Sequence, residues 1–185
     1  MNTQLTKPSK GSAGPMLPRL LHGPTLELHP SEEEVLHFLL PLSADYPGIE
    51  NWFRRKVVPG LRVQERYIHR VERDGHLIGV GIAKNGPTEK KICSVRVLPE
   101  HFGRGAGVRI FDHLLRWLDD DRPHLTVSEG KLPAFERIFD HYGFSETSQR
   151  NGLYVPGRFE LGFNENATAV NEDDARQPPS GQAGE

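Results

Sequence analysis

The stretch of the chain most suited to chemistry is the glycine-rich segment "EHFGRGAG" at residues 100–107. It places three glycines in five positions, with Arg104 between them and Arg109 shortly after. Glycine permits positive φ angles and has no side chain to hold a ligand away, so successive N–H groups can surround an anion. The amphipathic run that follows predicts a helix, whose first-turn N–H groups and dipole also favour negative charge. The segment therefore predicts a phosphate-binding loop, with a tight turn that merely needs glycine as the alternative.

The kind of phosphate ligand is narrowed by what this segment lacks. No Lys-Ser or Lys-Thr pair closes it, as in the P-loop of a nucleoside triphosphatase, and the glycine spacing of a dinucleotide fingerprint is incomplete. The elements before it are predicted hairpins rather than the βαβ start of a Rossmann fold. The sequence thus argues against both of these common phosphate sites.

Two charged residues stand where catalysis or substrate binding would need them. Glu129 ends the predicted strand "HLTVSE", where a carboxylate could take a proton from an ammonium substrate or, with equal weight, cap the following turn. Arg96 lies in the middle of another predicted strand, and a charge there needs a partner or a wet cleft. Arg96 therefore predicts either recognition of an anionic part of a substrate or an ion pair with a glutamate such as Glu65 or Glu72.

Other reactive side chains have simpler interpretations. Cys93, the single cysteine, lies in mid-strand and predicts a buried thiol in a reducing cytoplasm rather than a nucleophile. The nine histidines show no metal-ligand spacing, so no metal site is expected. The basic run at 54–56 predicts a solvated helix face, with a specific anionic partner as the alternative.

Composition divides the chain into one core and two tails. Residues 1–24 and the acidic segment 164–185 contain too few large apolar residues to offset the entropy of ordering, so both are expected to be disordered. The core is residues 25–163. No secretory signal or membrane-spanning run is visible, and the net charge is −2, so neither a membrane nor nucleic acid is expected as a partner, and the cytoplasm is the expected location.

The elements that must position these residues follow from hydrophobic periodicity. Their predicted order is β-α-α-β-β-β-α-β-α-β-β. An antiparallel meander in the middle of the chain runs into a single parallel β-α-β crossover. The fold class is therefore α/β in the α+β sense, with a mixed sheet.

Local signals also predict where individual elements begin and end. The expected features are a strand at 25–30, a capping box of Ser31 with Glu34, a second helix over 47–58 ending before Pro59, a hairpin at Asp74-Gly75, a helix ended by Gly143, and final strands near 144–149 and 153–163 around Asn151-Gly152.

Two segments carry a resemblance to a known family. "VRVLPEHFGRGAGVRIFDHLL" resembles the acetyl-CoA loop of the GNAT superfamily of N-acetyltransferases, in which a strand ending Val-x-Pro-Glu precedes a glycine loop and a helix. "LPAFERIFDHYGF" resembles that family's later helix, which ends in Gly-Phe. The predicted order of elements is also similar.

The resemblance implies an enzyme that transfers an acetyl group from acetyl-CoA to a primary amine of a small molecule or protein, by direct attack in a ternary complex. It implies that strands 92–98 and 124–129 separate to admit acetyl-CoA, and that Arg96 faces the acceptor. The sequence leaves open whether two copies of the chain form a homodimer. The residues that would bind acetyl-CoA are Val95, Val97, Gly103, Arg104, Gly105, Ala106, Gly107 and Val108.

The chain departs from the family pattern at three positions. Phe102 stands where Arg or Gln is usual, and Leu132 where asparagine is usual. Phe139 stands where many relatives carry a tyrosine that protonates the departing thiolate. The candidate catalytic residues are therefore Glu129, as proton acceptor, and Tyr142, for which core packing is the alternative.

Two other functions stay open on the sequence. A non-catalytic acyl-CoA-binding module is favoured by the missing tyrosine. A toxin-like enzyme that acetylates aminoacyl-tRNA is permitted by the basic helix, although the near-neutral core lacks the basic stripe typical of RNA binders.

Overall fold

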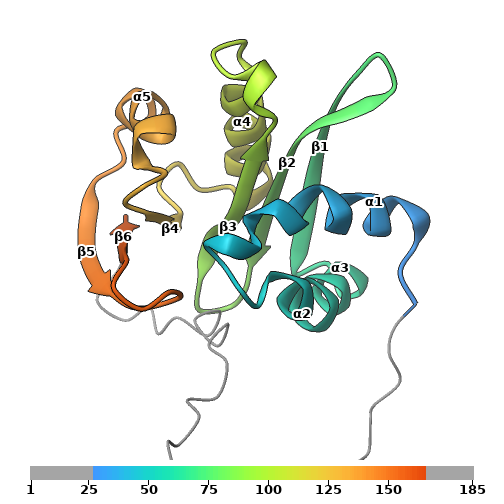
Figure 1. Ribbon diagram of the computed structural model, residues 1–185, viewed down its shortest axis with the longest axis horizontal. Coiled ribbons are helices and arrows are strands. Elements are labelled where there is room, and N and C mark those ends of the chain that lie inside the picture. Colours follow the sequence, from blue (N-terminus) through green and yellow to red (C-terminus); the bar gives the residue numbers. More distant parts are fainter. Residues whose placement is uncertain (1–26, 166–185) are drawn as a thin grey trace, which may run out of the picture.

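The fold is a mixed sheet of six strands with helices on both faces (Figure 1), seen in a computed structural model that describes residues 27–165. The strand order is β1-β2-β3-β4-β6-β5, with β3 and β4 parallel and all other neighbours antiparallel. This confirms the expected fold class of a meander followed by one crossover. The strands are β1 (Arg66–Arg73), β2 (His76–Asn85), β3 (Lys90–Val97), β4 (His124–Ser128), β5 (Glu146–Asn151) and β6 (Phe159–Phe163).

The helices form a layer on each side of this sheet. The first three α-helices and their connecting turns pack on one face, and the helices that follow β3 and β4 pack on the other. The helical segments are α1 (Pro30–Leu39), a 3₁₀ turn (Leu40–Ala44), α2 (Ile49–Trp52), a π-helical turn (Phe53–Val57), α3 (Val58–Arg62), a second 3₁₀ turn (Pro99–His101), α4 (Ala106–Leu118) and α5 (Leu132–Tyr142).

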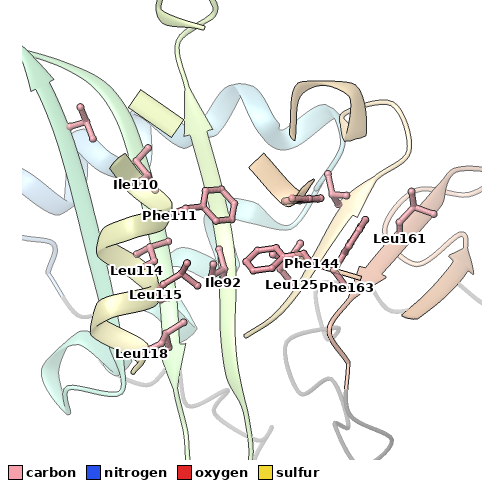
Figure 2. Packing of buried hydrophobic residues seen from close by; sticks show 14 of the residues in the cluster. Ile92, Ile110, Phe111, Leu114, Leu115, Leu118, Leu125, Phe144, Leu161 and Phe163 are labelled. Carbon is pink, nitrogen blue, oxygen red and sulfur yellow. The ribbon is translucent and has the colours of Figure 1, made fainter. Parts of the chain in front are cut away.

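Each layer has its own hydrophobic core. Val80 and Ile82 of β2 are fully buried beneath α1–α3. On the opposite face, Figure 2 shows side chains of α4, such as Phe111 and Leu114, facing those of β3, β4 and β6. Phe139 of α5 lies 4.6 Å from Phe163, centroid to centroid. This aromatic core spans both ends of the sheet.

A glycine in β2 lets α4 lie directly on the sheet. A Cβ atom at Gly81 would lie 2.3 Å from Cγ2 of Ile110 and 2.9 Å from Cδ1 of Leu114. Contacts this short are not compatible with any side chain. Gly81 thus fixes the depth of the helix that carries the glycine loop at its amino end.

The start of the described chain differs from the sequence expectation. Residues 27–29 have no regular structure and α1 begins at Pro30, so the expected strand at 25–30 is not seen within the described residues. The cap is His29 with Glu32, whose carboxylate accepts the His29 N–H at 2.9 Å, so the prediction of a box of Ser31 with Glu34 was wrong. Proline has no N–H and fits the first helical position, which moves the cap to the residue before it.

The second helical stretch continues through Pro59, where an end was predicted. A π-helical turn precedes it, in which Val58 N–H donates to the carbonyl of Phe53 five residues back. The wider turn allows Pro59, which lacks an N–H, to stand in the first turn of α3. The prediction of a helix end before Pro59 was therefore wrong.

The turns were predicted with mixed success. Asp74 and Gly75 adopt φ of 53° and 76° between β1 and β2, which confirms the two-residue hairpin. Gly143 ends α5 with φ of 65°, also as predicted. The last hairpin differs, since residues 152–158 form a longer connection between β5 and β6 and the predicted strand at 153–163 begins only at Phe159.

The predicted tails, 1–24 and 164–185, lie outside the described residues except for the first two of the second tail. Asn164 Nδ2 donates to the carbonyl of Pro123 at 3.2 Å, and the Glu165 carboxylate accepts from Arg150 at 2.6 Å. The described residues thus include two beyond the predicted limit of the core. Among the helices of residues 27–165, none has the length and hydropathy that a membrane span requires.

Candidate active site

The glycine segment forms an open turn that leads into α4. Gly103 and Gly105 have φ of 69° and 80°, and Gly105 is the N-cap of the helix. Arg109 N–H donates to the carbonyl of Gly105 at 3.0 Å, which begins the helical pattern. The N–H groups of Ala106, Gly107 and Val108 precede this bond, so they have no acceptor within the helix. This is the arrangement of donors that an anion requires.

The surface over this turn is open. A Cβ atom at Gly103 or Gly105 would meet no atom within 4 Å. The side chains of Arg104 and Arg109 are exposed beside it. An anion could therefore approach the amides without a side chain in its way and with two positive charges nearby.

Two further residues of the turn have different surroundings. A Cβ atom at Gly107 would lie 2.9 Å from Cδ1 of Ile138, so this glycine permits the close approach of α4 and α5. Phe102 is 55% exposed. At this position, where the family usually has a hydrogen-bond donor, the chain presents an apolar ring to solvent.

A cleft lies between β3 and β4. Their pairing is confined to Lys91 with His124 and Ile92 with Leu125 within the described residues, and the strands then diverge (Figure 1). This separation is the one that the sequence predicted. The cleft is lined from both strands, from α5 and from the end of the α1–α2 connection, among others by Tyr46, Ser94, Val95, Thr126, Lys131 and Phe139.

The two residues expected to pair with the cofactor differ in position. Both pack against the core under α4, but only Val95 is also among the residues that line the cleft. Phe139 also lines the cleft, so the position of the missing tyrosine does face the expected reaction site. Phe139 has no hydroxyl group to protonate a thiolate.

The structure brings a different tyrosine to the cleft. The hydroxyl of Tyr46 donates to Oε1 of Glu160 at 3.3 Å, and Glu160 is 4% exposed. Neither residue was among the sequence candidates. Glu160 had a signal, because it is an acidic residue within the apolar strand "FELGF". Tyr46 had no such signal in the sequence, because it lies in a connection without hydrophobic periodicity.

Charged groups hold the outer wall of the cleft together. Asp45, beside Tyr46, accepts from Lys131 Nζ at 2.9 Å and from Arg158 Nη1 at 2.6 Å. These bonds join the α1–α2 connection to the start of α5 and to the β5–β6 connection. They hold these outer elements of the cleft in place.

Tyr142 lies outside the cleft lining. Its hydroxyl donates to Oδ1 of Asp112 at 2.6 Å, and its ring stacks on Phe111 at 6.0 Å. Burial, together with the hydrogen bond and charge of Asp112, raises the pKa of Tyr142. The residue therefore ties α5 to α4, in agreement with the packing alternative.

Glu129 follows β4 as predicted, and it is exposed. Its carboxylate accepts the N–H of Phe159 at 3.4 Å, and its own N–H donates to the carbonyl of Phe159 at 3.0 Å. These bonds join the end of β4 to the start of β6. The side chain is a surface residue, as the alternative to a catalytic role held, but it bonds β6 rather than the turn that follows it.

Arg96 contacts α1. Its guanidinium donates to the carbonyl of Phe38 and lies 4.6 Å from the centre of the Phe38 ring. Burial lowers the pKa of Arg96, while the charge of Glu100 opposes this effect. The ion pair expected as one alternative is not the observed contact, since Glu72 instead accepts from Arg70 at 2.8 Å.

Cys93 and the basic helix face have structural partners. Cys93 is a half-buried free thiol that accepts from Arg66 Nη1 at 3.3 Å. Arg54 bonds Glu50 at 3.0 Å along the helix, and the neighbouring Arg55 and Lys56 are exposed. The Arg54 pair agrees with a solvated helix face, whereas Cys93 lines the cleft and is not the fully buried thiol that was expected.

Comparison with known proteins gives this geometry a family. Residues 28–144 match the profile of the acetyltransferase (GNAT) family. No curated protein matches the sequence.

Solved structures share the fold at low sequence identity. A GNAT-family protein from Desulfovibrio desulfuricans is similar with a TM-score of 0.59 and 13% identity, covering 74% of this chain and 93% of that one. The PaiA N-acetyltransferase of Thermoplasma acidophilum, in complex with coenzyme A, is similar with a TM-score of 0.51 and 15% identity. The match covers 71% of this chain and 91% of that one. The aminoglycoside 6′-N-acetyltransferase of Enterococcus faecium is similar with a TM-score of 0.52 and 10% identity. The match covers 72% of this chain and 88% of that one.

The family profile covers more than half of the chain and includes both the glycine turn and the separated strands. The chain therefore belongs to the GNAT family of acetyltransferases.

Proposed function

We propose that this acetyltransferase transfers the acetyl group of acetyl-CoA to a primary amine by direct attack in a ternary complex. The observation that carries the proposal is that β3 separates from β4 beyond Ile92 and then leads into the glycine turn, whose helix begins with N–H groups that have no acceptor within the helix. One end of this arrangement suits a diphosphate, and the other suits an extended amide chain.

The residues fit acetyl-CoA in two places. The open turn at Gly103 and Gly105, with the N–H groups up to Val108 and the side chain of Arg104, would hold the pyrophosphate. Beyond Ile92, the edge of β3 that faces β4 is left without strand pairing to it within residues 27–165. That edge, at Val95 and Val97, would pair with the amides of the pantetheine arm as an added strand would.

The chemistry requires a neutral amine, alignment with the thioester and a proton for the departing sulfur. Of the two candidates from the sequence, Glu129 stands at the end of β4 and would act through water. Tyr142 we assign to packing, because Asp112 engages its hydroxyl between α4 and α5. Tyr46 lines the cleft, and its hydroxyl is a candidate for the role of the tyrosine that Phe139 replaces.

The acceptor is a small-molecule or protein amine. We assign Arg96 to holding α1 on the sheet rather than to substrate, because its guanidinium is occupied by Phe38. We do not extend the proposal to aminoacyl-tRNA, since Arg54 of the basic face is bonded to Glu50.

A matched pair of glycine variants tests the cofactor site. Gly105→Val places a branched side chain over the amides, and Gly75→Val imposes the same backbone strain in the β1–β2 turn, where φ is also positive and the space is also open. We expect Gly105→Val to weaken coenzyme A binding at least tenfold in calorimetry and Gly75→Val to leave it within twofold. Equal affinities in both variants would contradict the proposed pyrophosphate site.

One observation favours a second function. Phe139 removes the usual proton donor, which suits a module that binds acyl-CoA without turnover. Release of thiol from acetyl-CoA in the presence of spermidine, kanamycin or a peptide with an amino-terminal alanine separates the two. Coenzyme A binding without thiol release above the rate of the buffer would favour the binding module.

A further inference from the structure

Exposed apolar side chains border the glycine turn on both sides. In the part of the chain that the structure describes, the large apolar residues at the surface are Val63 at 64% exposure, Phe102 at 55% and Val108 at 36%. A single exposed apolar residue is common and needs no explanation. Two of these three, however, flank one turn, since Phe102 directly precedes Gly103 and Val108 directly follows Gly107. The larger and more exposed of the two is Phe102.

The backbone of Phe102 takes no part in the set of free N–H donors. Its N–H donates to the carbonyl of Pro99 at 3.0 Å, which closes the 3₁₀ turn before the glycines. The N–H groups without an acceptor in the helix are those of the first turn of α4, which begins at Ala106. Phe102 therefore offers a bound phosphate neither a side-chain donor nor a backbone donor, and what it presents to a ligand is its ring.

The surface beside this ring is open and positively charged. A Cβ atom at Gly103 or at Gly105 would meet no atom within 4 Å. The side chains of Arg104 and Arg109 are both exposed. Free N–H donors, two cations and an aromatic ring thus lie within a stretch of eight residues. A ligand that uses all of these features carries a phosphate group close to a flat ring of its own.

Coenzyme A has this combination. Its pyrophosphate joins the pantetheine arm on one side to the ribose of an adenosine on the other. The proposed function places the arm along the open edge of β3 and the pyrophosphate on the glycine turn, so the adenosine begins at the turn. Purine rings stack on aromatic side chains, and this stacking contributes to affinity even where no hydrogen bond reads the base.

We propose that Phe102 stacks on the adenine ring of coenzyme A and thereby selects coenzyme A thioesters over donors that carry only a phosphopantetheine arm. The inference rests on the proposed function, because it needs the pyrophosphate on the glycine turn. A phosphopantetheine arm attached to a carrier protein has the same thioester and amides but no adenine. Phe102 adds nothing to the binding of such a donor, so its role is in specificity and not in the chemical step.

The binding of two ligands to the full chain tests this contact. Coenzyme A and 4′-phosphopantetheine share the arm and its first phosphate, but coenzyme A alone has the adenine. We expect Phe102→Ala to raise the Kd for coenzyme A about tenfold, because stacking is lost, and to leave the Kd for 4′-phosphopantetheine within twofold. Titration followed by NMR measures both constants, including weak ones. Val63→Ala removes an equally exposed apolar side chain at the end of α3 and should change neither constant.

Two further variants separate a stacked ring from general apolar contact. Phe102→Leu keeps an apolar side chain but loses the planar ring, so the Kd for coenzyme A should rise at least fivefold. Phe102→Trp keeps a planar ring, so this Kd should stay within twofold of that of the natural protein. Coenzyme A should also quench the fluorescence of the introduced indole, and 4′-phosphopantetheine should not. Because residue 102 is exposed, we expect all three variants to fold.

The outcomes separate this inference from the proposed function. A Phe102→Leu protein that binds coenzyme A as tightly as the natural protein would overturn the stacking contact. Equal weakening of both ligands by Phe102→Ala would also overturn it, since the residue would then contact the arm or its phosphate. In either case the pyrophosphate site stands or falls by Gly105→Val alone. If the natural chain binds no coenzyme A, the proposed function and this inference fall together.

Discussion

At the scale of single residues, the two tyrosines nearest the proposed chemistry have opposite surroundings. Tyr142 is held between two helices by Asp112, whereas Tyr46 faces the cleft and bonds a buried carboxylate. A hydroxyl that donates to a carboxylate outside the reaction site has no thiolate to protonate. The residue that looked nearest to the family's acid in the sequence is thus the one that the structure uses for packing.

Removal of the Tyr142 hydroxyl separates packing from catalysis. Because burial and Asp112 raise the pKa of Tyr142, the phenol stays protonated at neutral pH and its hydrogen bond is intact. We expect Tyr142→Phe to lower the free energy of unfolding by about 1 kcal/mol in urea titration. Turnover should stay within twofold of the natural protein. A loss of more than tenfold in kcat without a loss of stability would instead restore Tyr142 as the acid.

The sequence could predict the glycine turn because every part of it is local. The glycines, Arg104 and the helix start lie within a few residues of one another. The N–H groups at the start of a helix then point toward an anion because of backbone geometry alone. The Tyr46–Glu160 contact joins positions 114 residues apart. Such a contact depends on how the α1–α2 connection packs over the sheet, which periodicity does not specify.

At the scale of elements, hydrophobic periodicity predicted α4, α5 and the meander well. Their apolar residues lie on one face, and their ends carry strong turn signals such as Asp74-Gly75. The errors fall where proline competes with a standard signal. Pro30 moved the cap of α1 to His29, and the π-helical turn carried the second helix through Pro59. Both depend on backbone hydrogen bonds that residue type alone does not reveal.

The seat of α4 on β2 gives a prediction for element packing. Gly81→Ala places a methyl group 2.3 Å from Ile110 and should force α4 away from the sheet. We expect a loss of about 2–3 kcal/mol in the free energy of unfolding, measured by urea titration. Coenzyme A affinity should fall as well, because the displaced helix carries the glycine turn.

Gly130→Ala is the control for this change. A Cβ atom at Gly130 would meet nothing within 4 Å, so its stability should stay within about 0.5 kcal/mol of the natural protein. A Gly81→Ala protein as stable as this control would show that α4 is not seated as described.

At the scale of the whole molecule, a buried charge network joins the two halves of the sheet. The two ring nitrogens of His124 lie 2.8 Å from Glu89 and 3.0 Å from Glu165. Lys84 Nζ lies 3.1 Å from Glu89 on the side of β2. The network therefore runs from the meander to the end of β6, below the cleft.

This network predicts how stability depends on pH. Burial alone would raise the pKa of Glu89, but the hydrogen bond from His124 and the charges of Lys91 and Lys84 outweigh it, and the pKa is lowered from 4.5. The pKa of Glu165 is also lowered, because Arg150 and His124 help to outweigh its burial. A lowered folded-state pKa stabilises the fold above about pH 4.5, and this contribution is lost as the pH falls.

Urea unfolding between pH 7 and pH 3 measures the effect. The natural protein should keep its stability down to about pH 5 and lose it steeply below that. Glu89→Gln should cost about 3 kcal/mol at pH 7, because it removes the buried negative charge that His124 and Lys84 both contact. Its stability should also fall less steeply in acid. Parallel curves for the two proteins would contradict the assignment.

The short pairing of β3 with β4 has a consequence for the choice of donor. Only two residue pairs join these strands. The two halves are otherwise connected by side chains: the aromatic core under α4, the bonds of Asp45 and Tyr46, and the Glu89–His124 contact. A small rotation of one half against the other would widen the gap without breaking further backbone bonds. We therefore expect the length of the tolerated acyl chain to be limited by this rotation rather than by a closed pocket wall. Propionyl and butyryl thioesters should thus serve as donors at rates that decline gradually with chain length.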